Sequence, residues 1–437
     1  MRGSIRTALL GASAACALCI GVSAAQAGAF LIREQSTIGT GLSTAGAAAD
    51  GAGMGSAFWN PATITDYPGW QSSWSVTGIF PSANITANAG STLAGAPFDL
   101  SPQSGNIGRN ALVPASYNSY QVNDRLWVGY STTAPFGMVT KNPPVWAGNV
   151  FGMTSKVTSF DINPTIAYKI TDTISVAAGL QVMWFGARLT SAIPFSSGVA
   201  TLKGISWGYG FTLGTTWKPV DGTEVGLGYR SSVQENLKGS LTYGSSVGPF
   251  LGQYPAQEKV DLPDTLTIGL RQRITPDFTL LTGFEWDHWS RLGTVPVVYA
   301  GSGVVPQNIP FDYNDGWLAS LGGEYKWNQN LTLRAGLGYE KSPIDDANRQ
   351  IRLPDADRIW TSIGASYKVS DKISLDFAYS HLFPTNGSIT STMPLPPPAP
   401  TINFFGTVTS HIDIVSVGLE YRWDASAASP APVVAKY

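Results

Sequence analysis

The sequence predicts an all-β membrane protein: a 14-stranded antiparallel transmembrane β-barrel with an N-terminal hatch plugging the lumen. Three observations predict it. A hairpin pattern recurs six times, its strands alternate between apolar and polar residues, and aromatic residues lie at both ends of the apolar stripes. After residue 27, no stretch approaches the roughly 20 apolar residues of a spanning helix, so a membrane form of this chain must be a closed barrel.

The N-terminus predicts export. Two arginines precede an apolar run at 8–22, and small residues at 25–27 suit a cleavage site, so residues 1–27 are predicted to be a signal peptide. The alternative, a spanning anchor, is disfavoured because the run is short and rich in small residues. Cys16 and Cys19 both lie in this segment. The mature chain is therefore expected to use no disulfide or cysteine–metal chemistry.

Residues 28–69 are expected to form the hatch. They are dominated by Gly and Ala, which makes them too small for an independent core and too apolar for a free linker. About forty compact residues can fold into a fourteen-strand lumen; the alternative is a loose periplasmic tail. Acidic side chains are expected to face the mixed charges of the wall, and an Asn-Pro turn to restrain the hatch backbone. The predicted hatch and gating residues are Asn60, Pro61, Ala62, Glu34 and Asp50.

Residues 70–423 are expected to form the barrel. The six hairpins supply twelve strands, and single strands near 70–80 and 408–423 make fourteen, an even number that closes antiparallel. The tight turns are centred on Asp124, Asp172, Asp221, Asp277, Asn330 and Asp371. The longer connections are expected at 81–108, 138–155, 190–204, 243–258, 292–312, 344–357 and 386–407. Residues 424–437 are expected to be a disordered periplasmic tail.

Alternation within the strands separates an apolar face from a polar one. In 331–340 the odd positions are Leu, Leu, Ala, Leu and Tyr, and the even positions are Thr, Arg, Gly, Gly and Glu. A soluble sandwich would also alternate. The aromatic residues at the ends of the stripes favour a membrane, because interfacial girdles place aromatics there.

Composition excludes several functions. The net charge is −2 without a run of basic residues, which argues against nucleic acid as a partner. No metal or cofactor motif is present. The three histidines, His288, His381 and His411, belong to no Ser-His-acid or His-x-x-x-His pattern, so no enzyme activity is expected. Fourteen strands close without a partner, which predicts a monomer. A general aqueous porin is an alternative that would need an open lumen.

Several segments together resemble one family. They include Asn60-Pro61-Ala62, LPDTLTIGL at 262–270, EWDHWSRL at 285–292, LRAGLGYEKSP at 333–343 and LPDADRIW at 353–360. With these the chain resembles the FadL-type long-chain fatty acid and hydrocarbon transporters of the bacterial outer membrane. The resemblance implies a plugged barrel that captures hydrophobic molecules outside, holds them in a lumen pocket above the hatch, and releases them sideways into lipid through a gap in the third strand.

The third strand, expected at 125–137, carries a proline near its end. Proline deletes a ladder donor, and glycines in the same strand weaken it further. The alternative is a proline that merely ends the strand. The predicted lateral opening consists of Pro135, Phe136 and Gly137.

The ligand is expected to be a fatty acid, a hydrocarbon or a detergent-like molecule, with outer-membrane lipids around the barrel. Family members have a basic residue at the outer end of the fifth strand, and the matching position here is Arg188. Its parity points outward unless a bulge intervenes, so a surface arginine beyond the girdle is the alternative. A second family cation is replaced by Asn314, which favours neutral hydrocarbons. The other predicted contacts are Phe30, Trp146, Phe151, Met153 and Phe250.

Overall fold

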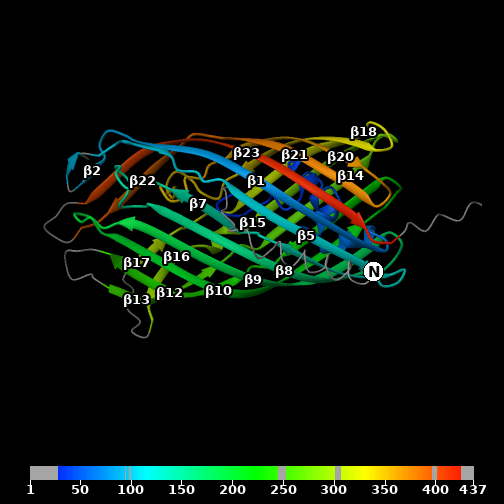
Figure 1. Ribbon diagram of the computed structural model, residues 1–437, viewed down its shortest axis with the longest axis horizontal. Helices are drawn as coiled ribbons and strands as arrows, with labels where there is room; N and C mark the ends of the chain where they lie inside the picture. The colour runs from blue at the N-terminus through cyan, green and yellow to red at the C-terminus, as the bar shows by residue number, and fades with distance from the viewer. Residues whose placement is uncertain are drawn as a thin grey trace, which may run out of the picture.

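The computed structural model describes residues 28–93, 95–97, 100–244, 252–300, 307–395 and 401–424. In this part of the chain the long strands form one closed, tilted β-sheet (Figure 1). The predicted signal peptide, the tail after Asp424 and Phe250 lie outside the described residues. Among the helices of the described residues, none has the length and apolar character needed to cross a membrane.

Fourteen antiparallel strands make the wall, as predicted. Ten cross as one piece: β1 (Trp70–Ala87), β5 (Ala111–Gln121), β8 (Thr154–Lys169), β9 (Ile174–Ala192), β10 (Val199–Trp217), β15 (Phe278–Asp287), β18 (Gly316–Lys326), β19 (Leu331–Lys341), β20 (Arg358–Lys368) and β23 (Ile402–Arg422). Four are interrupted: β6/β7 (Leu126–Thr133, Gly137–Lys141), β11/β12 (Thr223–Arg230, Gln234–Gly244), β13/β14 (Gly252–Asp261, Thr265–Arg273) and β21/β22 (Ile373–Pro384, Gly387–Met393). Pairing of β1 with β23 closes the barrel.

Several shorter strands lie at one end of the wall. They are β2 (Thr92–Leu93), β3 (Ala96–Pro97), β4 (Gln103–Asn106), β16 (Thr294–Tyr299) and β17 (Gln307–Pro310). They belong to the longer connections, so this end is called the loop end. The six predicted tight turns lie at the opposite end, the turn end, where the rings of Trp70 and Trp423 stack 4.8 Å apart.

The wall is taller at the loop end than the sequence predicted. Strand β1 continues past residue 80 and β23 begins before residue 408, because their ladder runs on to the pair Ala87–Gly406. The third long connection, expected at 190–204, spans only 193–198, since β9 and β10 stay paired up to Ala192 and Val199. Continued backbone pairing is favoured here because both strands alternate without a breaker.

The strands alternate between lipid and lumen faces. On β9 the outward Val176 and Leu180 are 36% and 50% exposed, whereas the inward Gln181 is 1% exposed. The predicted amphipathic pattern is therefore confirmed for this strand. Outward side chains remain accessible in the isolated molecule because lipid, not protein, would cover them.

Residues 28–69, called the N-terminal segment, lie inside the wall (Figure 1). Four short helices form it: α2 (Thr37–Thr40), η1 (Ala47–Ala49), η2 (Gly53–Phe58) and η3 (Pro61–Asp66). They contact strands on opposite sides of the barrel, α2 against β21 and η3 against β9 and β10. Wall glycines permit this close approach: a Cβ on Gly226 would lie 1.6 Å from the Ala48 carbonyl oxygen.

Candidate functional site

The third wall strand breaks at residues 134–136. β6 pairs with β5 only up to Ser116–Thr132, and among the described residues no ladder pair joins Ala111–Ala115 of β5 to the third strand. A single bridge, Gly108–Thr140, restores contact nearer the loop end. The wall therefore has a gap in its hydrogen-bonded ladder beside Pro135. The strand resumes as β7, so Pro135 interrupts the strand and does not end it.

The N-terminal segment pairs with the broken strand from inside. The Ile32 amide donates to the Pro135 carbonyl at 2.8 Å, and the Gly137 amide donates to the Phe30 carbonyl at 2.8 Å. The Gln35 side chain donates to the Ala134 carbonyl at 2.9 Å. These bonds satisfy backbone groups that the wall ladder leaves unpaired. The start of the N-terminal segment and the predicted lateral opening are therefore one connected structure.

Aromatic rings pack where the two meet. Phe30 is buried and its ring lies 4.7 Å from Trp289 and 6.1 Å from Phe136, between centroids. A larger apolar cluster of inward side chains surrounds them and includes Met183, Phe185, Leu237, Leu241, Leu262 and Ile309. Apolar side chains thus dominate this part of the interior. A void of ≈ 10 Å³ lies beside Pro135 and Phe136, so side chains fill the interior next to the gap.

Charged side chains hold the N-terminal segment to the wall. The Arg33 guanidinium contacts Glu285 at 2.5 Å and Glu340 at 2.6 Å and also binds Asp287, and all four side chains are buried. The indole of Trp59 donates to Glu285 at 2.7 Å. A buried cation is stable when several carboxylates surround it, whereas any member alone would be costly.

The predicted acidic hatch residues have other environments. One Glu34 carboxylate oxygen is buried without a hydrogen-bond partner in the described residues, and burial raises the pKa of Glu34 to about 7. Asp50 accepts a hydrogen bond from the Tyr67 hydroxyl within the same segment. The wall contact expected of Glu34 and Asp50 is therefore made most directly by the neighbouring Arg33, which the sequence reasoning missed.

Asn60 connects the segment internally and to the wall. Its amide donates to the carbonyls of Ala48 at 2.7 Å and Thr215 at 2.9 Å, and its side-chain oxygen accepts from the Ala62 amide at 3.0 Å. Asn60 thereby caps η3, whose first residue is Pro61. The Asn-Pro turn is therefore bonded both within the N-terminal segment and to the wall, and the gating role of Asn60, Pro61 and Ala62 stays a prediction.

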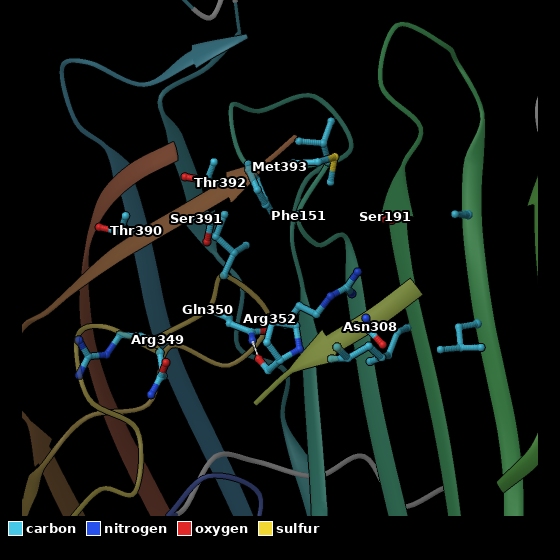
Figure 2. A pocket seen from close by; sticks show the side chains of 18 of the residues that line it. Phe151, Ser191, Asn308, Arg349, Gln350, Arg352, Thr390, Ser391, Thr392 and Met393 are labelled. Atoms are coloured by element: carbon cyan, nitrogen blue, oxygen red, sulfur yellow. Dashed lines mark hydrogen bonds between the residues drawn. The ribbon is translucent and has the colours of Figure 1, made fainter. Parts of the chain in front are cut away.

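A cavity of ≈ 310 Å³ lies at the loop end (Figure 2). Phe151, Leu189, Leu202 and Ile309 supply apolar lining, and Arg352 supplies a positive charge. The Arg352 guanidinium donates to the Thr190 carbonyl at 3.0 Å and forms no ion pair with any described residue. Burial lowers the pKa of Arg352 to about 10, which leaves it charged at neutral pH.

The remaining predicted contacts are scattered. Phe151 lines the cavity, Trp146 is buried against Phe404 at 5.6 Å, and half-buried Met153 lies outside the lining. Arg188 points outward and is exposed, so its predicted contact with a lumen ligand is not supported. The reason is that β9 stays in register with both neighbours without a bulge, which keeps its parity outward. The sequence feature that could have pointed to Arg352 is its position directly before the LPDADRIW motif at 353–360.

The closed fourteen-strand wall, its outward apolar band and the enclosed segment define a β-barrel protein of the bacterial outer membrane. Comparison with known proteins narrows this class. The family model described as outer membrane protein transport protein (OMPP1/FadL/TodX) matches residues 18–423. The chain belongs to this family.

Similar proteins agree with that assignment. A 47 kDa outer membrane protein of Pasteurella multocida is 28% identical over 84% of this chain and 90% of its own length. A long-chain fatty acid transport protein of Escherichia coli is 25% identical over 81% and 86%. Two solved structures share the fold: a Pseudomonas aeruginosa FadL homologue (22% identity, TM-score 0.82, 91% of this chain and 100% of that one) and the Pseudomonas putida toluene transporter TodX (17%, 0.66, 89% and 99%).

Proposed function

We propose that this protein is a passive outer-membrane channel for hydrophobic compounds with an acidic head, with long-chain fatty acids as the first candidate substrate class. The gap between β5 and the broken third strand carries the proposal, because it offers an exit at the level of lipid. A hydrophobic molecule that leaves the barrel through this gap enters the membrane without crossing water.

The route begins at the loop end. Capture occurs in the cavity, where apolar side chains contact the tail and Arg352 contacts the carboxylate. The ligand then displaces the aromatic contacts among Phe30, Phe136 and Trp289 and reaches the gap. The N-terminal segment acts as the hatch that keeps the lumen closed to water, which disfavours a general porin.

A second candidate substrate class is neutral aromatic or aliphatic hydrocarbons. Asn314 favours it, since this residue contributes no positive charge and its amide donates to Asp345 at 3.1 Å. The unpaired Arg352 favours the acid. If the substrate is an acid, removal of the Arg352 charge should weaken its binding. If the substrate is a neutral hydrocarbon, the same change should leave binding unaffected.

The exit route is tested by locking the N-terminal segment to the third strand. Leu31 and Phe136 face each other as bridge partners, a spacing that a disulfide can span. The mature chain as predicted has no other cysteine, so the double variant Leu31→Cys/Phe136→Cys can form only this bond. We expect uptake of a labelled fatty acid to fall under oxidising conditions and to recover with reductant.

The matched control is Leu337→Cys/Thr361→Cys, a cross-strand pair in an unbroken part of the wall. Its uptake should be the same oxidised and reduced. Equal uptake by the locked and unlocked Leu31–Phe136 variant would refute release past this strand. A steady large ionic current through the unlocked protein in a planar bilayer would instead support the porin alternative.

A further inference from the structure

The outer surface carries a row of cations at the loop end of β8, β9 and β10. Lys156 pairs in register with Arg188, and Arg188 pairs with Lys203. Lys238 on β12 lies one row nearer the membrane, opposite Ile205. All four side chains point outward by the alternation of their strands. They are called the outer cation row.

The row borders a shallow groove. Its lining includes all four cations together with Trp184 and Gly186. Gly186 lies between Trp184 and Arg188 on the outward face of β9, and the Trp184 indole lies over it, 3.0 Å from where a Cβ would be. The groove has a volume of ≈ 430 Å³ and carries positive charge on several sides.

Among the described residues, these cations have no carboxylate partner. None of the four forms an ion pair with a described residue. The surrounding stretches 138–160, 182–209 and 236–257 contain no Asp or Glu at all, so the adjoining connections bring none either. Other outward cations differ: Lys341 contacts Asp357 at 2.8 Å and Lys259 contacts Asp261 at 3.8 Å. Four like charges on adjacent strands repel one another unless an anion joins them.

The height of these cations relative to the membrane interface identifies the class of anion that they bind. Trp184 pairs with Phe160 on one side and with Trp207 on the other, which forms an aromatic row of the kind that marks the membrane interface. Arg188 lies four residues beyond Trp184, about 13 Å along the strand and roughly 10 Å in depth for a tilted strand. Groups at that height in a bilayer are lipid headgroups. Longer loops face the exterior in barrels of this kind, so the leaflet is the outer one.

We propose that the outer cation row is a binding site for a lipid of the outer leaflet whose headgroup carries clustered phosphates. Its acyl chains lie along the apolar strand faces beside Trp184 and Trp207, and its phosphates occupy the groove among Lys156, Arg188 and Lys203. Lysine and arginine bind phosphate through charge-assisted hydrogen bonds. Such a lipid fixes the barrel's vertical position and lies next to β8, one strand from the gap at Pro135.

Binding of the full chain, purified in detergent, to diphosphorylated lipid A tests the proposal, with enzymatically dephosphorylated lipid A and inorganic pyrophosphate as the other probes. Wild type should bind the phosphorylated lipid and bind the dephosphorylated lipid at least ten-fold more weakly. Each lost cation should cost roughly five-fold in affinity, so Arg188→Gln/Lys203→Gln should bind about 25-fold more weakly. The matched control Lys259→Gln/Lys341→Gln removes the same charge where carboxylates already neutralise it.

Each outcome either supports or overturns the proposed lipid site. A selective loss in the Arg188/Lys203 variant, with unchanged thermal unfolding and fatty acid uptake, supports the site. An equal loss in the control variant, or equal binding of both lipids, overturns it in favour of non-specific attraction. Competition by pyrophosphate at the lipid's own concentration overturns the lipid as occupant in favour of a free phosphate. Because the variants lie on the outer face, failure here leaves the proposed transport route untouched.

Discussion

The buried Arg33 and the half-buried Arg352 lie at two places in this barrel under opposite conditions. Arg33 in the N-terminal segment is surrounded by Glu285, Asp287 and Glu340, whereas the Arg352 guanidinium at the loop end reaches, among the described residues, a carbonyl and a hydroxyl. The first charge is already satisfied and holds the structure together. The second has no ion-pair partner among the described residues, and in the proposed function it meets the anion. The same residue type is thus structural in one half of the lumen and a candidate ligand contact in the other.

The largest expected effect comes from removing the satisfied charge. Arg33→Met would leave the buried carboxylates of Glu285 and Asp287 without their cation and Glu340 with Arg358 alone, and breaking such a cluster costs about 3–5 kcal/mol. We expect the free energy of unfolding in vesicles to fall by that amount and the N-terminal segment to become susceptible to protease. Arg273→Gln, whose partner Asp221 is exposed, should cost less than about 1 kcal/mol. Equal losses in the two variants would contradict the assigned roles.

Glu34 has the next largest effect, and its effect depends on pH. Its folded pKa of about 7 lies above the ordinary 4.5, so the folded state favours the protonated form. Ionisation therefore destabilises the fold progressively above pH 4.5, by up to about 3 kcal/mol above pH 7. Glu34→Gln should stabilise the protein at pH 8 and change little at pH 4. The exposed Asp277→Asn should be neutral at both, and a pH-independent gain for Glu34→Gln would refute the argument.

The contrast between the two arginines was only partly predictable from the sequence. Hairpin turns such as Asp124 and the alternation of β9 depend on local chemistry, so the strand count was predicted correctly. The parity of Arg188 was also local, and it pointed outward as the pattern indicated. Arg33 was missed because its partners lie 252 or more residues away. The partial burial of Arg352 depends on how a long connection folds at the loop end, which no strand periodicity encodes.

The unsatisfied arginine should govern recognition of a carboxylate. Arg352→Ala should weaken binding of a long-chain fatty acid by about 2 kcal/mol, roughly 30-fold, and leave its methyl ester unaffected. Arg352→Lys should retain part of the difference because the charge remains. Arg188→Ala is the matched control, since it removes an arginine from the outer face. If acid and ester lose affinity equally on Arg352→Ala, the residue acts by packing, and the neutral hydrocarbon becomes the better candidate substrate.

The smallest expected effect on ligand affinity comes from the apolar lining of the same cavity, and it can be measured separately from the effect of the Arg352 charge. Phe151 lines the cavity without a polar group, so its truncation removes contact with the tail whatever the head. Phe151→Ala should weaken fatty acid and methyl ester alike by about 1 kcal/mol, roughly five-fold. Met153→Ala, two residues away and outside the lining, should change neither. The double variant Phe151→Ala/Arg352→Ala should then show additive losses for the acid, because tail and head contact different parts of the cavity. A loss confined to the acid would mean that Phe151 acts by positioning Arg352, and the division between tail and head contacts would fail.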